Sequence, residues 1–207
     1  MTNTPSTPRQ RRTQAERLEI SGRRMLQAAT ALIAEKGWEA TTAADIGRRA
    51  GYSRALVHRR YGSKDALLDE LFRSEYEDWL NPTPDPAATG LQNVLAPLER
   101  ITQLFADDPR FLESMFVLSF EAVKRDTPLR PRIAAWMNRI SDTVRDGLKK
   151  GTSDGSIRPG INTDAAVADI VAATVGIAYG WIVLPDRYDL PRELARLRDR
   201  IVRDYGT

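Results

Sequence analysis

Residues 37–63 contain a glycine or a residue with a hydroxyl side chain every few positions, and such residues commonly end or begin helices. Gly37 is a natural stop for the helix that precedes it. Thr42 offers an N-cap hydroxyl, with an acidic residue three positions later as a weak capping box. Gly51 ends the next helix after about two turns, and Ser53 and Ser63 can each cap another. The segment therefore accommodates only short helices joined by tight turns.

Longer amphipathic helices flank this segment on both sides. Apolar residues recur at three-and-four spacing over residues 25–33 and again over residues 67–79. Two short helices with a glycine-containing turn, braced by longer helices, predict a helix-turn-helix. The two apolar stripes consist of Met25, Ala28, Ala29, Leu32 and Ile33, and of Leu67, Leu68, Leu71, Phe72, Tyr76 and Trp79.

The stretch NPTPDPAATG, residues 81–90, contains three prolines and a glycine and predicts a domain boundary. Every later segment also has helical periodicity, and strand-like alternation does not stand out, so we expect an all-α fold. The predicted units are a disordered basic arm at 1–14, a three-helix helix-turn-helix domain at 15–80 and a larger helical domain at 81–207. The helices expected in the last unit cover residues 91–107, 109–124, 130–150, 164–184 and 191–205.

The net charge of +3 conceals a strong asymmetry along the chain. Residues 1–64 carry 13 Lys and Arg against 5 Asp and Glu, whereas residues 65–207 carry 18 against 23. A basic first third on a slightly acidic remainder suggests a part that binds a polyanion, joined to a body with another task. The arm with Arg9, Arg11 and Arg12 is either a solubilising tail or a contact to a DNA minor groove or flanking phosphates.

Several other classes of protein are disfavoured by the composition. The chain has no cysteine, which excludes disulfides and thiolate metal sites and fits a reducing cytoplasm. Its first dozen residues lack the apolar core of a signal peptide. The longest uncharged run, Ile170 to Pro185, is short for a membrane span, so we expect a buried helix and no membrane partner. The single histidine, His58, has no thiolate to join it, so no metal site is expected.

The helix that starts at Ser53 can meet the needs of a DNA-reading helix. Such a helix needs an exposed polar face and apolar side chains that fix it to the body. Leu56 or Val57, together with Tyr61, can pack inward and leave the polar side chains outside. Arginine pairs bidentately with guanine, whereas His, Ser and Lys more often contact phosphates. The alternative reading of the basic cluster at 58–60 is a solvated charged face.

Over residues 20–70 the sequence resembles the N-terminal domain of the TetR family of transcriptional regulators. The family pattern runs through Gly-aromatic, Thr-Thr, Ile-Ala, Ala-Gly-Val-Ser, Leu-Tyr, Tyr-Phe and Ser-Lys-Glu-Leu. The matching positions here are Gly37-Trp38, Thr41-Thr42, Ile46-Gly47, Ala50-Gly51-Tyr52-Ser53, Val57-His58, Arg60-Tyr61 and Ser63-Lys64-Asp65-Leu67. The stretch RPGINTDAAVADIV is also similar to the one that leads into the family's penultimate helix.

The resemblance implies a DNA-binding head with two kinds of contact. It assigns phosphate contacts to Thr42, His58 and Lys64, the last at a helix N-terminus that also favours phosphate. The residues at or near the bases would be Ser53, Arg54, Ala55, Leu56 and Arg59. The chain departs from the pattern where His58 replaces the usual Tyr, Ala55 the usual Gly and Arg60 a usual Tyr or His.

The resemblance also implies a homodimer formed through the last two helices. Small residues at helical spacing allow two helices to approach closely, and Ala172, Ala173, Gly176 and Gly180 have this spacing. A symmetric helix-turn-helix binder needs two heads, which favours a dimer face over packing within one chain.

In the family, helices of the C-terminal domain enclose a cavity for a small, largely apolar effector. Aromatic residues at helical spacing more often belong to a core, but some of these would line such a cavity, with acidic and basic side chains as polar contacts. The residues expected there are Glu113, Phe116, Phe120, Glu121, Trp136, Arg139, Ile140, Tyr179 and Trp181.

The function that follows is a cytoplasmic, homodimeric repressor that binds a palindromic operator on double-stranded DNA and is released by the effector. An activator, or a regulator without an effector, is the alternative within the same family. An enzyme is disfavoured, because the sequence shows no metal cluster, no nucleophile with its base and no phosphate loop, and no cofactor is expected. A nucleoid-type binder would lack the large apolar C-terminal domain.

Overall fold

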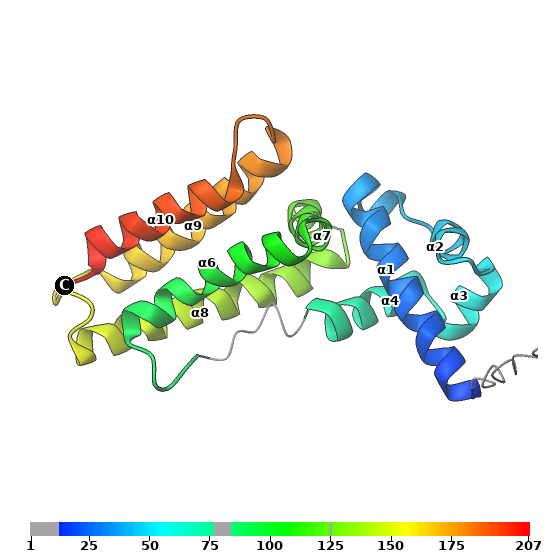
Figure 1. Ribbon diagram of the computed structural model, residues 1–207, viewed down its shortest axis with the longest axis horizontal. Helices are drawn as coiled ribbons and strands as arrows, with labels where there is room; N and C mark the ends of the chain where they lie inside the picture. Colours follow the sequence, from blue (N-terminus) through cyan, green and yellow to red (C-terminus); the bar gives the residue numbers. More distant parts are fainter. Residues whose placement is uncertain (1–12, 77–83, 125) are drawn as a thin grey trace, which may run out of the picture.

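The computed structural model describes residues 13–76, 84–124 and 126–207, and the regular elements in these ranges are helices joined by turns (Figure 1). Within them no strand occurs, and one isolated bridge pairs Ile157 with Gly206. The all-α prediction is confirmed. The first twelve residues of the arm predicted at 1–14, together with Trp79 and the first part of the proline-rich stretch, lie outside the described residues, whereas Thr13 caps α1 and Gln14 begins it.

The first helices form a small cluster around the predicted helix-turn-helix (Figure 1). The side chains of Thr42, Ser53 and Ser63 each accept a backbone N–H at a helix start, so the predicted N-caps are confirmed. The elements are α1 (Gln14–Ala40), α2 (Ala43–Ala50), α3 (Arg54–Tyr61), α4 (Lys64–Leu71) and a π-helical turn, η1 (Phe72–Tyr76).

The regular helix of α1 is interrupted at Gly37, where the sequence predicts its end, and the element continues beyond the kink to Ala40. Gly37 has φ 79° and ψ 170°, and the Thr41 N–H donates to the Trp38 carbonyl at the end of the element. This backbone conformation is open almost only to glycine. The last turn of α1 therefore leaves the axis of the rest of the helix, and Trp38 within it is buried.

The remaining helices form the body of the molecule. These helices are α6 (Gly90–Asp107), α7 (Pro109–Glu121), α8 (Leu129–Asp154), α9 (Thr163–Val183) and α10 (Leu190–Tyr205). Figure 1 shows α6 beside α8, α9 beside α10, and α7 between α1 and the α6–α8 pair. Helix α8 continues to Asp154, beyond the predicted end, whereas α7 ends at Glu121 and not at Lys124.

Helices α6 and α8 meet backbone to backbone at three glycines. A Cβ on Gly90 would overlap the backbone N of Gly151, and one on Gly147 would lie 2.9 Å from a methyl carbon of Val94. Side chains at these positions would hold the helices apart, so glycine permits the close approach.

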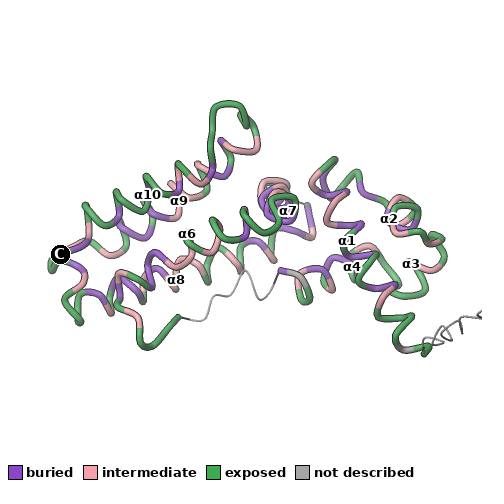
Figure 2. The backbone as a smooth tube through the Cα atoms, viewed as in Figure 1, coloured by how far each residue is buried: buried purple, intermediate pink, exposed green. Residues whose placement is uncertain are grey.

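Helix α9 is less buried than the sequence predicts. It is long and apolar enough to cross a membrane by length and composition, yet 28% of its most apolar window is buried within the chain. Ala166, Val167 and Ile170 are buried, while Val175 and Tyr179 are exposed (Figure 2). The helix packs one side onto its own chain and leaves an apolar side uncovered, which is why the expected buried helix is not observed.

Candidate functional site

The turn between α2 and α3 is fixed by two glycines. Gly51 takes a left-handed conformation with φ 78° and donates its N–H to the end of α2. A Cβ on Gly47 would lie 2.9 Å from the carbonyl oxygen of Tyr52, so this position lets the turn fold back closely onto α2. The angle of α3 relative to α2 is thus set by local backbone constraints.

Helix α3 presents a polar face to solvent. Val57 is 2% exposed and anchors the helix in the core, while Leu56 is half-buried, which settles which of the two packs inward. Ser53, Arg54, Ala55, His58 and Arg59, all of them expected at DNA, are exposed, and so is Arg60.

A surface hollow of about 200 Å³ brings several of these side chains together. Arg54 and His58 of α3 border it from one side, and Ser63 and Lys64 from the start of α4. Apolar side chains of α2, α3 and α4 also line it. The hollow therefore combines two cationic side chains, one imidazole and the N-terminus of a helix, which is a suitable place for a phosphate group.

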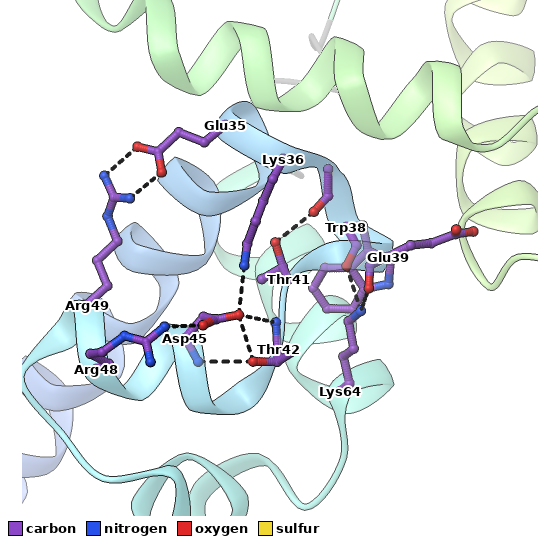
Figure 3. Close-up of polar contacts among 11 residues, drawn as sticks. Glu35, Lys36, Trp38, Glu39, Thr41, Thr42, Asp45, Arg48, Arg49 and Lys64 are labelled. Carbon is purple, nitrogen blue, oxygen red and sulfur yellow. Dashed lines mark hydrogen bonds and ion pairs between the residues drawn. The ribbon is translucent and has the colours of Figure 1, made fainter.

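Lys64 has a structural task besides the phosphate contact expected of it. Its Nζ donates to the carbonyl oxygens of Trp38 at 2.6 Å and Glu39 at 3.2 Å, and it lies 4.5 Å from the centre of the Trp38 indole (Figure 3). Burial lowers the pKa of its ammonium, although the nearby carboxylates of Glu121, Glu39 and Asp65 oppose the shift. The residue ties the start of α4 to the bend in α1.

Thr42 caps α2 through a network that also reaches α1 (Figure 3). Its Oγ accepts the backbone N–H of Asp45 at 3.1 Å and donates to the Asp45 carboxylate at 2.8 Å. Lys36 donates to the same carboxylate at 2.7 Å. Hydrogen bonds from Lys36, and then from Thr42, hold the pKa of Asp45 well below its usual value. The weak capping box predicted from the sequence is confirmed.

Arg60 turns away from the exposed face of α3 and toward α1. Its Nη1 donates to the carbonyl oxygen of Leu18 at 2.8 Å, and its guanidinium fills the space where Gly22 would carry a Cβ. Tyr61, beside it, donates from its hydroxyl to the Gly22 carbonyl at 3.4 Å. The sequence indicates no partner for Arg60, because Leu18 lies 42 positions away.

The body contains an apolar cavity of about 80 Å³ between α6, α7, α8 and α9. Three of the residues predicted for an effector pocket, Phe116, Trp136 and Ile140, line it. The other lining residues are Val94, Pro97, Leu98, Arg100, Ile101, Leu104, Leu112, Met115, Met137, Val144, Ile170, Val171, Thr174 and Val175.

The structure places the other six predicted pocket residues outside this cavity. Phe120, Tyr179 and Trp181 form a contiguous aromatic cluster with Phe116, with ring centres 5.2–6.4 Å apart. Glu121 uses its carboxylate to accept the backbone N–H of Trp38 at 2.8 Å. Neither Glu113 nor Arg139 is among the residues that line the cavity, and Arg139 is exposed on α8.

The small residues predicted for a dimer face differ in their exposure to solvent. Ala172 and Gly176 are exposed, Ala173 is half-buried, and nothing lies within 4 Å of a Cβ built on Gly176. Gly180 is buried instead, with the ring of Tyr188 2.6 Å from where its Cβ would be. Gly180 therefore serves packing within the chain. Among the described residues, no cluster of three or more His, Asp or Glu could hold a metal ion.

The chain is similar to known regulators in sequence. The family profile described as "Bacterial regulatory proteins, tetR family" matches residues 25–71. The chain is 28% identical over 185 residues to the HTH-type transcriptional repressor KstR2 of Mycolicibacterium smegmatis, covering 86% of this chain and 82% of that protein. It is 30% identical over 141 residues to the HTH-type transcriptional regulator CymR of Pseudomonas putida, covering 66% and 67%.

Solved structures share the fold at lower sequence identity. The SmeT–triclosan complex superposes with a TM-score of 0.78 at 22% identity, covering 90% of this chain and 92% of that one. The regulator FadR of Bacillus subtilis in complex with stearoyl-CoA has a TM-score of 0.71 at 19% identity, covering 87% and 97%. With its helix-turn-helix and its regulatory relatives, the chain belongs to the TetR family and is a DNA-binding transcriptional regulator, not an enzyme.

Proposed function

We propose that the protein is a homodimeric repressor that binds a palindromic operator and leaves it when a small apolar effector enters the body. The observation that carries this proposal is that α7 both lines the apolar cavity and contacts the bent end of α1 in the head. Operator binding places the protein in the cytoplasm, where bacterial DNA lies.

The polar face of α3 would enter the major groove. Arg54 and Arg59 are the side chains we expect to read base edges, with Ser53, Ala55 and Leu56 close to the bases. His58 and Lys64 border the hollow in which a phosphate would lie, and Thr42 at the start of α2 would contact another. Two heads in a dimer would meet half-sites one DNA turn, or about 34 Å, apart.

The exposed apolar stripe of α9 supports the dimer. Ala172, Gly176, Tyr179 and Val183 follow each other at intervals of three or four residues, so they lie along one side of the helix. Tyr179 is 54% exposed and Val183 is 51% exposed. A continuous apolar stripe of this kind normally marks an interaction surface, and a second copy of the same helix would cover it. In this arrangement Tyr179 and Val183 replace Gly180 in the predicted interface.

The contacts between α7 and the head provide a route for the effector's influence. Leu112, Met115 and Phe116 of α7 line the cavity, and Glu121 at the end of the same helix holds the Trp38 N–H. Trp38 in turn accepts from Lys64 at the start of α4. A displacement of α7 would therefore shift the bend of α1 and the start of α4 together. Release requires the effector to bind the shifted conformation more tightly than the DNA-bound one.

The decisive experiment is selection of bound sequences from a random DNA pool with the full chain. We expect a two-fold symmetric consensus, because two identical heads read two half-sites in opposite orientation. Mapping that consensus to promoters, and measuring transcription with and without the protein, tests repression. Recovery of unrelated sequences would contradict specific operator binding.

A further inference from the structure

The wall of the cavity between α6, α7, α8 and α9 is almost entirely hydrocarbon, so its polar groups stand out. Among the described residues that line it there is no Asp or Glu, and the polar members are Arg100, Trp136 and Thr174. The Thr174 hydroxyl already donates to the carbonyl oxygen of Ile170 at 2.8 Å. Arginine keeps its positive charge at every physiological pH. The wall thus offers donors to a ligand, and little that would accept from it.

The indole N–H of Trp136 lacks a hydrogen-bond acceptor in the part of the chain that the structure describes. Its indole Nε1 is buried, with no hydrogen-bond partner among the described residues. An indole N–H can only donate, and buried donors in folded proteins are nearly always paired. Because Trp136 borders the cavity, a ligand that separates the helices can bring an acceptor atom to this covered donor and complete its hydrogen bond.

A much smaller cavity also borders Trp136. It has a volume of about 10 Å³ and is lined by Trp136, Ser119, Tyr76 and four apolar side chains. That volume is at the lower limit for one water molecule, which also needs two to four polar partners. The Ser119 hydroxyl donates to Met115 O, and the Tyr76 hydroxyl is hydrogen-bonded to Ser114. The larger cavity is therefore the better source of an acceptor for the indole.

The volume of the larger cavity limits how a ligand can enter. At about 80 Å³ it is roughly half the size of an engineered apolar cavity that holds benzene. Ligand pockets are normally several times larger, about 300 Å³ or more. A ligand of one ring or more must therefore separate the helices, and the hydrogen bond to Trp136 helps to offset the cost of doing so.

We propose that the effector is a compact apolar molecule with a carbonyl or carboxylate oxygen, and that Trp136 recognises this oxygen. The proposal rests on the effector-responsive function given above and names the chemistry of its ligand. A cationic group is disfavoured, because the described residues of the wall include no carboxylate to receive it.

Four one-ring probes test this chemistry by calorimetric titration of the full-length protein. Acetophenone carries a neutral acceptor, benzoate an anionic one, ethylbenzene none, and benzylammonium a positive charge. The cost of opening the cavity is similar for all four and cancels in the comparison. We expect acetophenone and benzoate to bind about fivefold to tenfold more tightly than ethylbenzene, and benzylammonium to bind most weakly. Equal affinities for acetophenone, benzoate and ethylbenzene, or no binding by any probe, would overturn the proposal.

Substitution of the indole provides the second test. Trp136→Phe keeps a ring but removes the N–H, so the advantage of acetophenone over ethylbenzene should disappear. Trp181→Phe is the matched control, because Trp181 lies in the neighbouring aromatic cluster and does not line the cavity; it should keep the advantage. If Trp136→Phe keeps it too, the indole does not recognise the oxygen. If Trp136→Phe does not fold, the comparison of the four probes on the unaltered protein still decides the ligand class.

Operator release is measured separately, by fluorescence anisotropy of labelled DNA. Preferential binding of acceptor probes without release upholds the ligand chemistry and counts against the effector-responsive function. Release by probes that show no preference for an acceptor upholds the effector-responsive function and counts against the proposed ligand chemistry.

Discussion

The carboxylate of Glu121, at the end of α7, accepts the backbone N–H of Trp38 at 2.8 Å, although the two residues lie 83 positions apart in the sequence. The bend at Gly37 makes this contact accessible, because the other Glu121 oxygen occupies the space where a Cβ of Gly37 would be. A single side chain of the body thus holds the point at which the head changes direction.

Gly37→Ala should destabilise the protein and weaken operator binding. The backbone conformation costs about 1–3 kcal/mol for a residue with a side chain, and the new methyl group would displace Glu121. Chemical denaturation measures the first effect and DNA titration of the folded variant the second. Gly155→Ala is the control, since Gly155 also has a positive φ of 81° but has open space around it. It should cost about 1 kcal/mol and leave operator affinity unchanged. Equal losses of operator affinity in both variants would show that the Glu121 contact is irrelevant to DNA binding.

Arg59→Ala should weaken specific DNA binding by about 1–3 kcal/mol, because it removes an expected base contact on the exposed face of α3. Its thermal stability should stay close to that of the unaltered protein.

The adjacent substitution Arg60→Ala should affect stability more than DNA binding. It removes the hydrogen bond to Leu18 and should lower the free energy of unfolding by about 0.5–1.5 kcal/mol, with a smaller effect on DNA affinity. Titration of a labelled operator at fixed salt and thermal unfolding distinguish the two variants. If Arg60→Ala weakens DNA binding more than Arg59→Ala, the assignment of the reading face is wrong.

The capping network around Asp45 predicts a pH dependence of stability. Its pKa is lower in the folded protein than in the unfolded chain, so its contribution is fully present above its ordinary pKa of about 3.9. The contribution is lost as the pH falls from there toward the folded-state pKa. Asp45→Asn should be less stable than the unaltered protein at neutral pH, and the difference should shrink below about pH 4.

Urea unfolding across this pH range measures the effect of Asp45. Asp65→Asn, in the first turn of α4, is the control for a general effect of charge near a helix start. A difference between Asp45→Asn and the unaltered protein that stays constant down to pH 3 would rule out the ionised network as its cause.

Val183→Asp should separate the proposed dimer. A carboxylate on the apolar stripe of α9 would be buried without a partner and should weaken association by about 3 kcal/mol or more. Analytical ultracentrifugation measures the association, and DNA titration should show a parallel loss of operator affinity. Val123→Asp provides a matched control, because Val123 is 78% exposed in the turn that follows α7. A dimer that survives Val183→Asp unchanged would place the interface elsewhere.

The elements of the head were predictable because their signals are local. Thr42, Ser53 and Ser63 cap helices through backbone groups three residues away, so a short stretch of sequence contains the whole interaction. The inward packing of Val57 and the exposure of Arg59 follow from the same helical periodicity.

The cavity and the links between head and body were less predictable, because they depend on how helices cross. Phe116 lines the cavity and Phe120, one turn later on the same helix, does not. Arg60 and Glu121 find backbone partners 42 and 83 positions away. Periodicity places such residues on a face of a helix but does not indicate which helix will lie opposite.

The glycine contact joins α6 and α8, two of the four helices that border the cavity. At Gly90 and Gly151 the two backbones touch, with no side chains between them that could adopt new rotamers. A ligand that enlarges the cavity would therefore separate this pair less readily than it would displace α7 and α9, the other two helices at the cavity. Helix α7 contacts the DNA-binding head, and α9 carries the proposed dimer stripe. The stiffness of the glycine contact between α6 and α8 would therefore direct the movement caused by a bound ligand toward the head and the dimer interface.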